Sequence, residues 1–275
     1  MPELPEVETV RRILHPQLAG QAIRAVTVNR ADVLAHPAPD EFCRAVAGRR
    51  IEGVGRRGKF LRLGLAGGGE VLVHLRMTGC LVVAPAGWPE DKHTHVVFHL
   101  DGKRELRFSD ARRFGRLWLC RPGEEDTFSG VHKLGPEPFD EAFDAAYLQR
   151  VLGARRRAIK ECLLDQSVVA GIGNIYGDEI LFAAHIHPGR PAASLSKQEW
   201  ARLAEAVPAV LQKGIEADRV TPQAYLESRG QSYRSAPSFV VYGHEGRPCP
   251  ACGTPLRRMV LGGRSSCYCP ACQKA

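Results

Sequence analysis

Apolar residues follow three successive spacings along the chain. Residues 6–19 carry apolar side chains three or four positions apart and end at Gly20, which predicts a helix. From residue 21 to about 120, short apolar–polar alternations are separated by Gly, Pro and Asp clusters, which predicts the strands of a β-sandwich or barrel. From about residue 140 the spacing is helical again. The helices expected there cover residues 141–152, 156–164, 175–185 and 196–217.

Two stretches show neither periodicity. Residues 130–138 contain repeated Gly and Pro residues and are interpreted as a linker. Residues 218–238 are polar and irregular, and a loop of this length is usually functional or mobile. We therefore predict an α+β protein, with an N-terminal helix and β-sandwich domain at 1–130 and a helical domain at 131–238.

The C-terminal segment, 239–275, is predicted to be a zinc ribbon. It carries two Cys-Pro-Ala-Cys motifs separated by sixteen residues, and paired motifs of this kind supply four thiolates to tetrahedral zinc. The alternative, two disulfides, does not suit the reducing compartment that the cysteine content indicates. The expected ligands of one structural Zn²⁺ are Cys249, Cys252, Cys269 and Cys272.

A β-hairpin is expected between the two motifs. Residues 256–261 and 265–268 can pair across a tight Gly262-Gly263 turn, which places Arg264 at or beside the tip. Cys267 is interpreted as a bystander thiol. A ribbon of this size has no cleft of its own, so its metal is predicted to be structural.

Charge and cysteine content restrict the partner and the compartment. The 275-residue chain has a net charge of +8 and a pI of about 9.1, which favours an anionic partner. No apolar run approaches ~18 residues, and the acidic N-terminus lacks the apolar core of a signal peptide. The odd count of nine cysteines then indicates a reducing cytoplasm.

In addition to the basic ribbon, the sequence contains three clusters of basic residues. One such cluster is typical of a solvated surface, whereas three indicate nucleic-acid binding through phosphate contacts. The clusters are Arg49, Arg50, Arg56, Arg57 and Lys59; Arg104, Arg107, Arg112, Arg113 and Arg116; and Arg155, Arg156, Arg157 and Lys160.

Four further features are ambiguous when taken alone. Phe114 beside Arg112 is either a wedge that enters a base stack or a core residue, and Met77 has the same two interpretations. The glycine-rich turn at 171–177 either receives a phosphate at a helix N-terminus or only connects two helices. Pro2, once Met1 is removed, is either a nucleophilic secondary amine next to the carboxyl of Glu3 or an ordinary chain end.

These motifs, in this order, resemble the formamidopyrimidine-DNA glycosylase / endonuclease VIII family of base-excision repair enzymes, over nearly the whole chain. Leu4 and the segment 7–9 are similar to the formamidopyrimidine-DNA glycosylase branch. The resemblance implies a helix-two-turn-helix domain at 131–238 with a lesion-capping loop at 218–238. It is carried by residues 2–9, 57–60, 74–79, 110–115, 134–138 and 171–176 and by the ribbon.

The activity implied by the resemblance is that of a bifunctional DNA glycosylase and AP lyase. It would excise oxidised purines (8-oxoguanine and formamidopyrimidines) from damaged double-stranded DNA, acting as a monomer in the bacterial cytoplasm, at the nucleoid and away from membranes. Pro2 would form a Schiff base with the sugar C1′, and Glu3 would act as general acid. Lys59 would donate a proton in β-elimination, and Arg264 would bind a phosphate and assist δ-elimination.

The resemblance also assigns contacts with DNA. One group of residues would contact phosphates, and another would insert into the duplex where the base leaves. The phosphate-binding residues would be His74 and Asn174, the inserted residues Met77, Arg112 and Phe114, and the further contacts His93 and one of Arg155 or Arg156.

The sequence departs from the family pattern in the capping segment and beside the residues that would insert into the duplex. Residues 218–222 and 233–235 replace the usual start and end of the capping segment, Arg76 stands where the family has glycine, and Ala111 replaces a proline. The alternatives are therefore a shifted lesion range, excision of oxidised pyrimidines as in endonuclease VIII, or a non-catalytic binder of damaged DNA.

Overall fold

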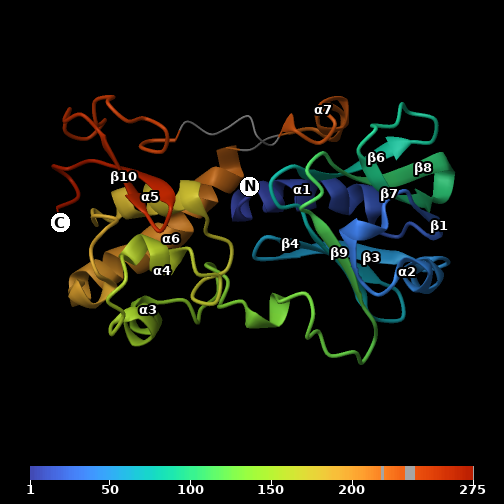
Figure 1. Ribbon diagram of the computed structural model, residues 1–275, viewed down its shortest axis with the longest axis horizontal. Helices are drawn as coiled ribbons and strands as arrows, with labels where there is room; N and C mark the ends of the chain where they lie inside the picture. The colour runs from blue at the N-terminus through green and yellow to red at the C-terminus, as the bar shows by residue number, and fades with distance from the viewer. Residues whose placement is uncertain (218–219, 233–238, 275) are drawn as a thin grey trace. The chain divides into compact units, whose positions relative to one another are not determined.

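The chain forms two compact units in a computed structural model that describes residues 1–217, 220–232 and 239–274 (Figure 1). The first unit comprises Met1–His132 and Asp218–Ser235, and the second comprises Lys133–Ala217 and Ala236–Ala275. No helix in the described ranges is long and apolar enough to cross a membrane.

The first unit is built on two sheets, as the alternating pattern predicted. A four-stranded sheet has the order β1-β7-β8-β6, and a five-stranded sheet has the order β2-β9-β5-β4-β3. Neighbouring strands are antiparallel except β2 and β9, which are parallel. The strands are β1 (Ile23–Val28), β2 (Leu34–His36), β3 (Ile51–Arg57), β4 (Phe60–Leu65), β5 (Glu70–His74), β6 (Gly79–Pro85), β7 (Thr94–Leu100), β8 (Arg104–Asp110) and β9 (Arg116–Cys120).

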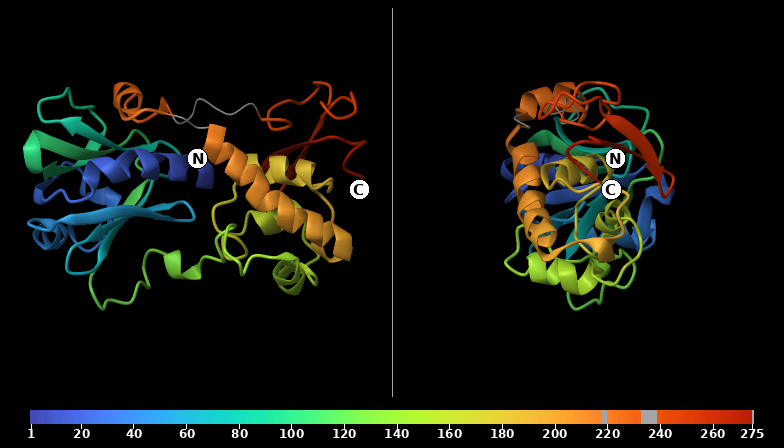
Figure 2. Two further views of the ribbon diagram at one scale, coloured as in Figure 1. Left: turned by 180° about the vertical axis from the view of Figure 1, so that it is seen from behind. Right: turned by 90° about the vertical axis from the view of Figure 1, so that its left-hand side faces the viewer.

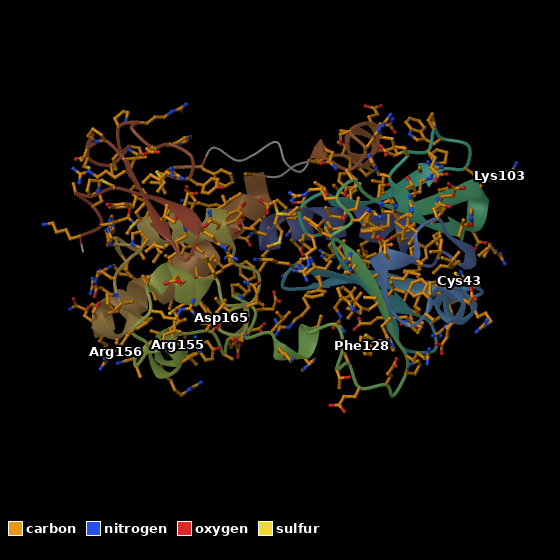
Figure 3. The ribbon with its side chains drawn as sticks, in the orientation of Figure 1. Cys43, Lys103, Phe128, Arg155, Arg156 and Asp165 are labelled. Carbon is orange, nitrogen blue, oxygen red and sulfur yellow. The ribbon has the colours of Figure 1, made fainter. Side chains whose placement is uncertain are left out.

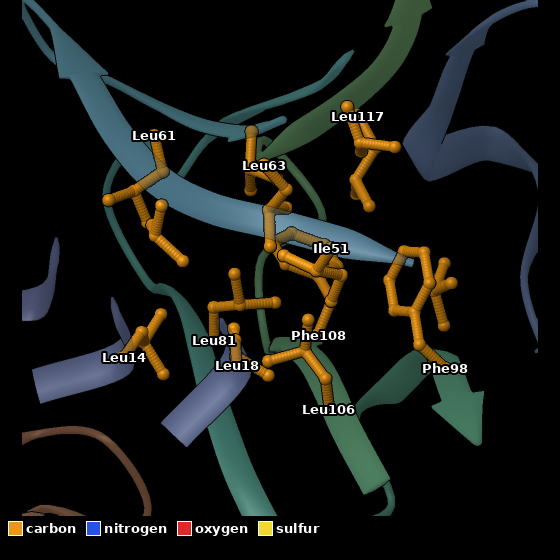
Figure 4. Packing of buried hydrophobic residues seen from close by; sticks show 14 of the residues in the cluster. Leu14, Leu18, Ile51, Leu61, Leu63, Leu81, Phe98, Leu106, Phe108 and Leu117 are labelled. Atoms are coloured by element: carbon orange, nitrogen blue, oxygen red, sulfur yellow. The ribbon is translucent and has the colours of Figure 1, made fainter. Parts of the chain in front are cut away.

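Helix α1 (Leu4–Leu18) packs into this unit along its apolar stripe. Val7, Val10, Leu14 and Leu18 are buried in one cluster with residues of both sheets, which is why the period of 3.6 was readable in the sequence (Figure 4). The helix begins two residues before the predicted start, because Glu3 caps it with its side chain.

Two helices of the first unit were not predicted. Helix α2 (Pro39–Val46) buries only Phe42 and Val46, so its apolar pattern is too short to stand out. Helix α7 (Pro222–Glu227) lies in the stretch expected to be irregular and is capped by Thr221. Its Tyr225 is 1% exposed and donates a hydrogen bond to the carbonyl of Leu81 in β6, so α7 covers that strand (Figures 1 and 2).

The second unit is helical and ends in the predicted hairpin. Its strands β10 (Arg257–Leu261) and β11 (Arg264–Tyr268) pair with Leu261 opposite Arg264 across the Gly262-Gly263 turn. The helices match the predicted ranges to within a few residues, except that the first begins four residues late. They are α3 (Ala145–Leu152), α4 (Ile159–Leu163), α5 (Asn174–Ala183) and α6 (Lys197–Ala217). Short 3₁₀ turns cover Ala31–Val33, Asp101–Lys103, Val131–Lys133 and Ala192–Ser194.

A buried ion pair fastens the hairpin to the helices of this unit. The Lys160 Nζ and Asp178 Oδ1 atoms are 2.6 Å apart, and both side chains are 1% exposed. Lys160 also donates to the carbonyl of Ser265 at 2.9 Å. Asp178 accepts hydrogen bonds from the Ser266 hydroxyl at 2.7 Å and from the Cys267 N–H at 2.9 Å. One ion pair thus joins α4, α5 and β11.

Asp178→Asn is expected to destabilise the second unit by about 3–5 kcal/mol, because it removes the carboxylate that pairs with the buried Lys160 ammonium. Thermal denaturation measures the change. Glu216→Gln, an exposed change on α6, should leave the melting temperature unaltered. Equal melting temperatures for the two variants would show that the ion pair does not stabilise the unit.

Candidate active site

Candidate residues of the first unit meet at one end of the five-stranded sheet. The turn between β3 and β4 carries Lys59, and Phe60 at the start of β4 pairs with His74 at the end of β5. His74 pairs in turn with Arg116 at the start of β9. Because these strands are antiparallel, the loops that follow β5 and precede β9 leave from the same end.

Helix α1 brings the chain terminus to that end. Its His15 Nδ1 lies 3.1 Å from the backbone nitrogen of Val54, whereas Glu8, two turns earlier, forms an ion pair with Arg56 at 3.3 Å. The helix therefore runs antiparallel to β3, and its N-terminus points toward the turn that carries Lys59. Pro2 and Glu3 are both buried there, with Glu3 3% exposed.

Glu3 is fixed by a capping box at the helix start. Its backbone N–H donates to the Glu6 carboxylate at 2.7 Å, and its own carboxylate accepts from the Glu6 backbone N–H. Pro5 in the first turn needs no hydrogen-bond acceptor of its own. Chain ends are usually mobile, but this one is held by a cap, and its carboxylate is favoured by the positive end of the helix dipole.

Lys59 and His74 are both buried, at 5% and 6% exposed. Burial and the positive charges of Arg76 and Lys59 lower the pKa of His74 to about 3, so its ring is neutral at physiological pH. The His74 Nδ1 accepts the Arg76 backbone N–H at 3.1 Å, which leaves the ring proton on Nε2. His74 can therefore donate to an anion without carrying a charge.

Arg76 has a left-handed backbone with φ of 54°. A side chain at this φ costs roughly 1–2 kcal/mol, which glycine avoids. Arg76→Gly is therefore expected to be more stable than Arg76→Ala by about 1 kcal/mol in denaturant unfolding. If Arg76→Ala were the more stable variant, residue 76 would not hold this conformation in solution.

Met77 and Phe114 are exposed, at 42% and 48%. The alternative that they are core residues is therefore wrong. The Arg112 guanidinium lies 4.6 Å from the centre of the Phe114 ring, so a cation and an aromatic ring form one exposed projection. His93 lies next to this projection, because its carbonyl accepts the Asp110 N–H at 3.0 Å.

In the second unit, Asn174 is the first residue of α5. The turn before it is held by Gln166, whose amide bonds the Gly171 N–H and the Ile172 carbonyl at 3.0 and 2.8 Å. Gly171 has a φ of 97°, a conformation that favours glycine. The Asn174 Oδ1 is buried and has no hydrogen-bond partner among the described residues.

Arg264 is exposed at the hairpin and lines a hollow of about 320 Å³ with Arg157 and Glu161. The two candidates Arg155 and Arg156 differ in their surroundings. Arg155 forms an ion pair with Asp165 at 3.3 Å, whereas Arg156 is exposed and forms no ion pair within the described ranges (Figure 3). This favours Arg156 for a phosphate.

The four predicted cysteine ligands are brought together. Their sulfur atoms all lie within 4.8 Å of one another, and the Cys249–Cys272 and Cys252–Cys269 sulfurs are 3.9 and 3.5 Å apart. Tetrahedral thiolates with Zn–S bonds of about 2.3 Å are separated by roughly 3.8 Å, so the site fits a structural zinc ion. Cys267 is buried outside the cluster.

The structure adds an anchor that the sequence interpretation missed. The Glu179 carboxylate accepts hydrogen bonds from the backbone N–H groups of Val240, Val241 and Tyr242 at 2.8–2.9 Å. It thereby fixes the chain just after the expected capping loop. An acidic residue in an apolar helix was the available signal. Within that loop, residues 218–219 and 233–238 lie outside the described residues.

Known protein families match the chain in three consecutive parts. Residues 1–117 match the formamidopyrimidine-DNA glycosylase N-terminal domain, 134–225 its H2TH domain, and 246–275 a zinc finger found in FPG and IleRS. Formamidopyrimidine-DNA glycosylase of Moorella thermoacetica is 52% identical over 94% of both chains. That of Desulforamulus reducens is 45% identical over the whole of both.

Solved structures agree with these relatives. Fpg of Lactococcus lactis in complex with DNA containing an abasic site has a TM-score of 0.86 and 30% identity, covering 99% of this chain and 100% of that one. The same protein in complex with DNA containing FAPY-dG has a TM-score of 0.87 and 32% identity over the same shares. The chain therefore belongs to the formamidopyrimidine-DNA glycosylase family.

Proposed function

We propose that this DNA glycosylase excises oxidised purines, 8-oxoguanine and formamidopyrimidines, from double-stranded DNA and then cleaves the abasic strand by β,δ-elimination. The observation that carries the proposal is the buried, capped chain end. Pro2 and Glu3 are held at the end of the sheet that also carries Lys59 and His74. The complexes of the Lactococcus lactis relative with abasic and FAPY-dG DNA support the substrate class.

The first step is attack by the Pro2 nitrogen on C1′ of the damaged nucleotide. Removal of Met1, which is exposed, frees this secondary amine, and an α-amino group with a pKa near ~8 is partly neutral at physiological pH. The N–C1′ bond forms as the bond to the base breaks, and the base leaves with that electron pair and a proton. Ring opening, with proton transfer to O4′ assisted by Glu3, gives an iminium.

The iminium then drives strand cleavage. It acidifies the C2′ protons, so loss of one proton expels the 3′ phosphate, and a second elimination expels the 5′ phosphate. Lys59 serves as the proton donor of the first elimination, and Arg264 binds the phosphate of the second. The Glu3 carboxylate, favoured by the helix dipole, also stabilises the cationic iminium.

DNA is held by phosphate contacts and by a wedge. His74 and Asn174 donate neutral hydrogen bonds to phosphates, and His93 and Arg156 add contacts in their own units. The exposed projection of Met77, Arg112 and Phe114 fills the space that the extrahelical base leaves. We propose that the protein acts as a monomer, because these groups are all supplied by one chain.

A shifted lesion range is the second candidate, and helix α7 favours it. This helix begins at Pro222, which has no backbone N–H to offer, and its Thr221 cap already occupies the Ala224 N–H at 3.2 Å. In such a capping segment, neither Pro222 nor Ala224 in the first turn has a free N–H group to donate to an oxidised base. Oxidised pyrimidines would then become substrates of the same lyase chemistry.

Borohydride trapping on a panel of duplexes tests both candidates. The panel contains 8-oxoguanine, a formamidopyrimidine, 5-hydroxycytosine or an abasic site in one sequence context. We expect a covalent adduct with the first two and the abasic site, and products that end in phosphate on both sides of the gap. Adducts with 5-hydroxycytosine but not 8-oxoguanine would establish the shifted range, and adducts with none would leave only a binder.

A further inference from the structure

One buried carboxylate holds both loops of the exposed projection. Asp110, the last residue of β8, is 1% exposed. Its Oδ1 accepts the Thr78 hydroxyl and, at 3.1 Å, the Arg112 N–H. Its Oδ2 accepts the Gly115 N–H at 2.7 Å. All three donors belong to the loops that carry the projection.

These bonds couple the two loops to each other. Thr78 follows Met77 directly, whereas Arg112 and Gly115 lie on either side of Phe114. The Thr78 hydroxyl oxygen also accepts the Arg112 N–H at 3.2 Å, so hydroxyl, carboxylate and backbone form one closed network. Any displacement of one loop therefore breaks bonds that hold the other.

The backbone around Asp110 shows that this arrangement is built in. The Asp110 carbonyl accepts the Arg113 N–H at 3.2 Å and the buried His95 ring N–H at 2.8 Å. Arg113 has a left-handed φ of 55°. A Cβ on Gly115 would lie 2.7 Å from the Phe108 ring and 3.1 Å from the Asp110 carboxylate, so only glycine lets the chain approach closely enough to donate.

We propose that Asp110 is the positioning residue that presents Met77 and Phe114 as a single rigid wedge. Exposed apolar side chains on separate loops would otherwise have to be ordered when DNA binds, at an entropic cost for each. Because one carboxylate holds both loops, they are already ordered in the folded protein before DNA binds. Both side chains can therefore enter the base stack together. The inference depends on the proposed function in one respect: Met77 and Phe114 must act as the wedge.

Asp110→Asn tests the proposal, because the amide has the shape of the carboxylate but must turn its NH₂ toward one of the three donors. Single-turnover excision is measured on duplex 8-oxoguanine and on the same lesion in an unpaired bubble, where no wedge is needed. We expect a loss of about tenfold or more in the duplex and less than about twofold in the bubble. Fluorescence of 2-aminopurine beside the lesion should rise less on binding.

Asp101→Asn is the matched control, because Asp101 also accepts a backbone N–H (Ala22, 3.2 Å) and pairs with an arginine, away from the wedge. It should leave both rates unchanged. If Asp110→Asn fails to fold, as its melting temperature will show, Thr78→Val carries the test. That variant removes the hydroxyl bonds alone and should show the same selective loss.

Two results would overturn the inference: equal losses on duplex and bubble in a folded variant, or no loss on either. Failure of the proposed function looks different. If the wild-type protein excises neither substrate but still raises the 2-aminopurine fluorescence, that fluorescence still reports insertion of the wedge. The inference then stands if Asp110→Asn suppresses that signal and falls if the signal is unchanged.

Discussion

Pro2→Gly is expected to reduce 8-oxoguanine excision by about 10²-fold or more, with an equal loss of the borohydride-trapped adduct. The variant keeps an amine at the chain end, but it loses the ring that fixes φ and makes the amine secondary. Misplacing a nucleophile by about 1 Å can cost 10²-fold in rate. Single-turnover kinetics and trapping on one duplex measure both quantities.

Pro5→Ala is the matched control for this experiment. It removes a buried proline from the first turn of the same helix and leaves both the nucleophile and the Glu3 cap in place. Excision should stay within about threefold of wild type, since alanine is a strong helix former. Both variants should still bind abasic duplex. A trapped adduct of full yield from Pro2→Gly, mapped by peptide sequencing to an amine other than that of residue 2, would refute the assignment.

Much of this fold could be predicted because local patterns and packing agree. The stripe on α1 and the Gly262-Gly263 turn of the hairpin are each determined by residues close in sequence. The order of strands in the two sheets is not, because any short alternating strand can pair with any other. Strand β6 shows the difficulty: both its faces are buried, and one cover is α7, about 140 residues later.

The candidate site, too, was predictable from the sequence only in part. Motifs identified Pro2, Lys59 and Asn174, but only the antiparallel register shows that Lys59 and His74 share one end of a sheet with the N-terminus of α1. Asp110 and Glu179 were not predicted as functional positions. A carboxylate that binds backbone N–H groups in the folded protein has the same sequence signature as a solvated one.

Zinc has a larger role in the second unit than the size of the ribbon suggests. The apolar cluster beneath the hairpin consists of Val241, Leu256 and three cysteines, of which Cys249 and Cys269 are also predicted ligands. So small a core supplies little stability without metal. Asp178 ties Ser266 and Cys267 of β11 to α5, but the two cysteine motifs that flank the hairpin depend on the metal.

Removal of zinc is therefore expected to lower excision by about 10²-fold or more, because Arg264 loses the scaffold that presents it. Cys252→Ser should release the metal and show the same loss, as measured by a colorimetric zinc assay and single-turnover cleavage. Cys267→Ser is the control, since this buried thiol lies outside the four-cysteine cluster and should retain one zinc ion per chain. Loss of zinc from Cys267→Ser would instead make Cys267 a ligand. Full activity in metal-free protein would show that the hairpin presents Arg264 without zinc.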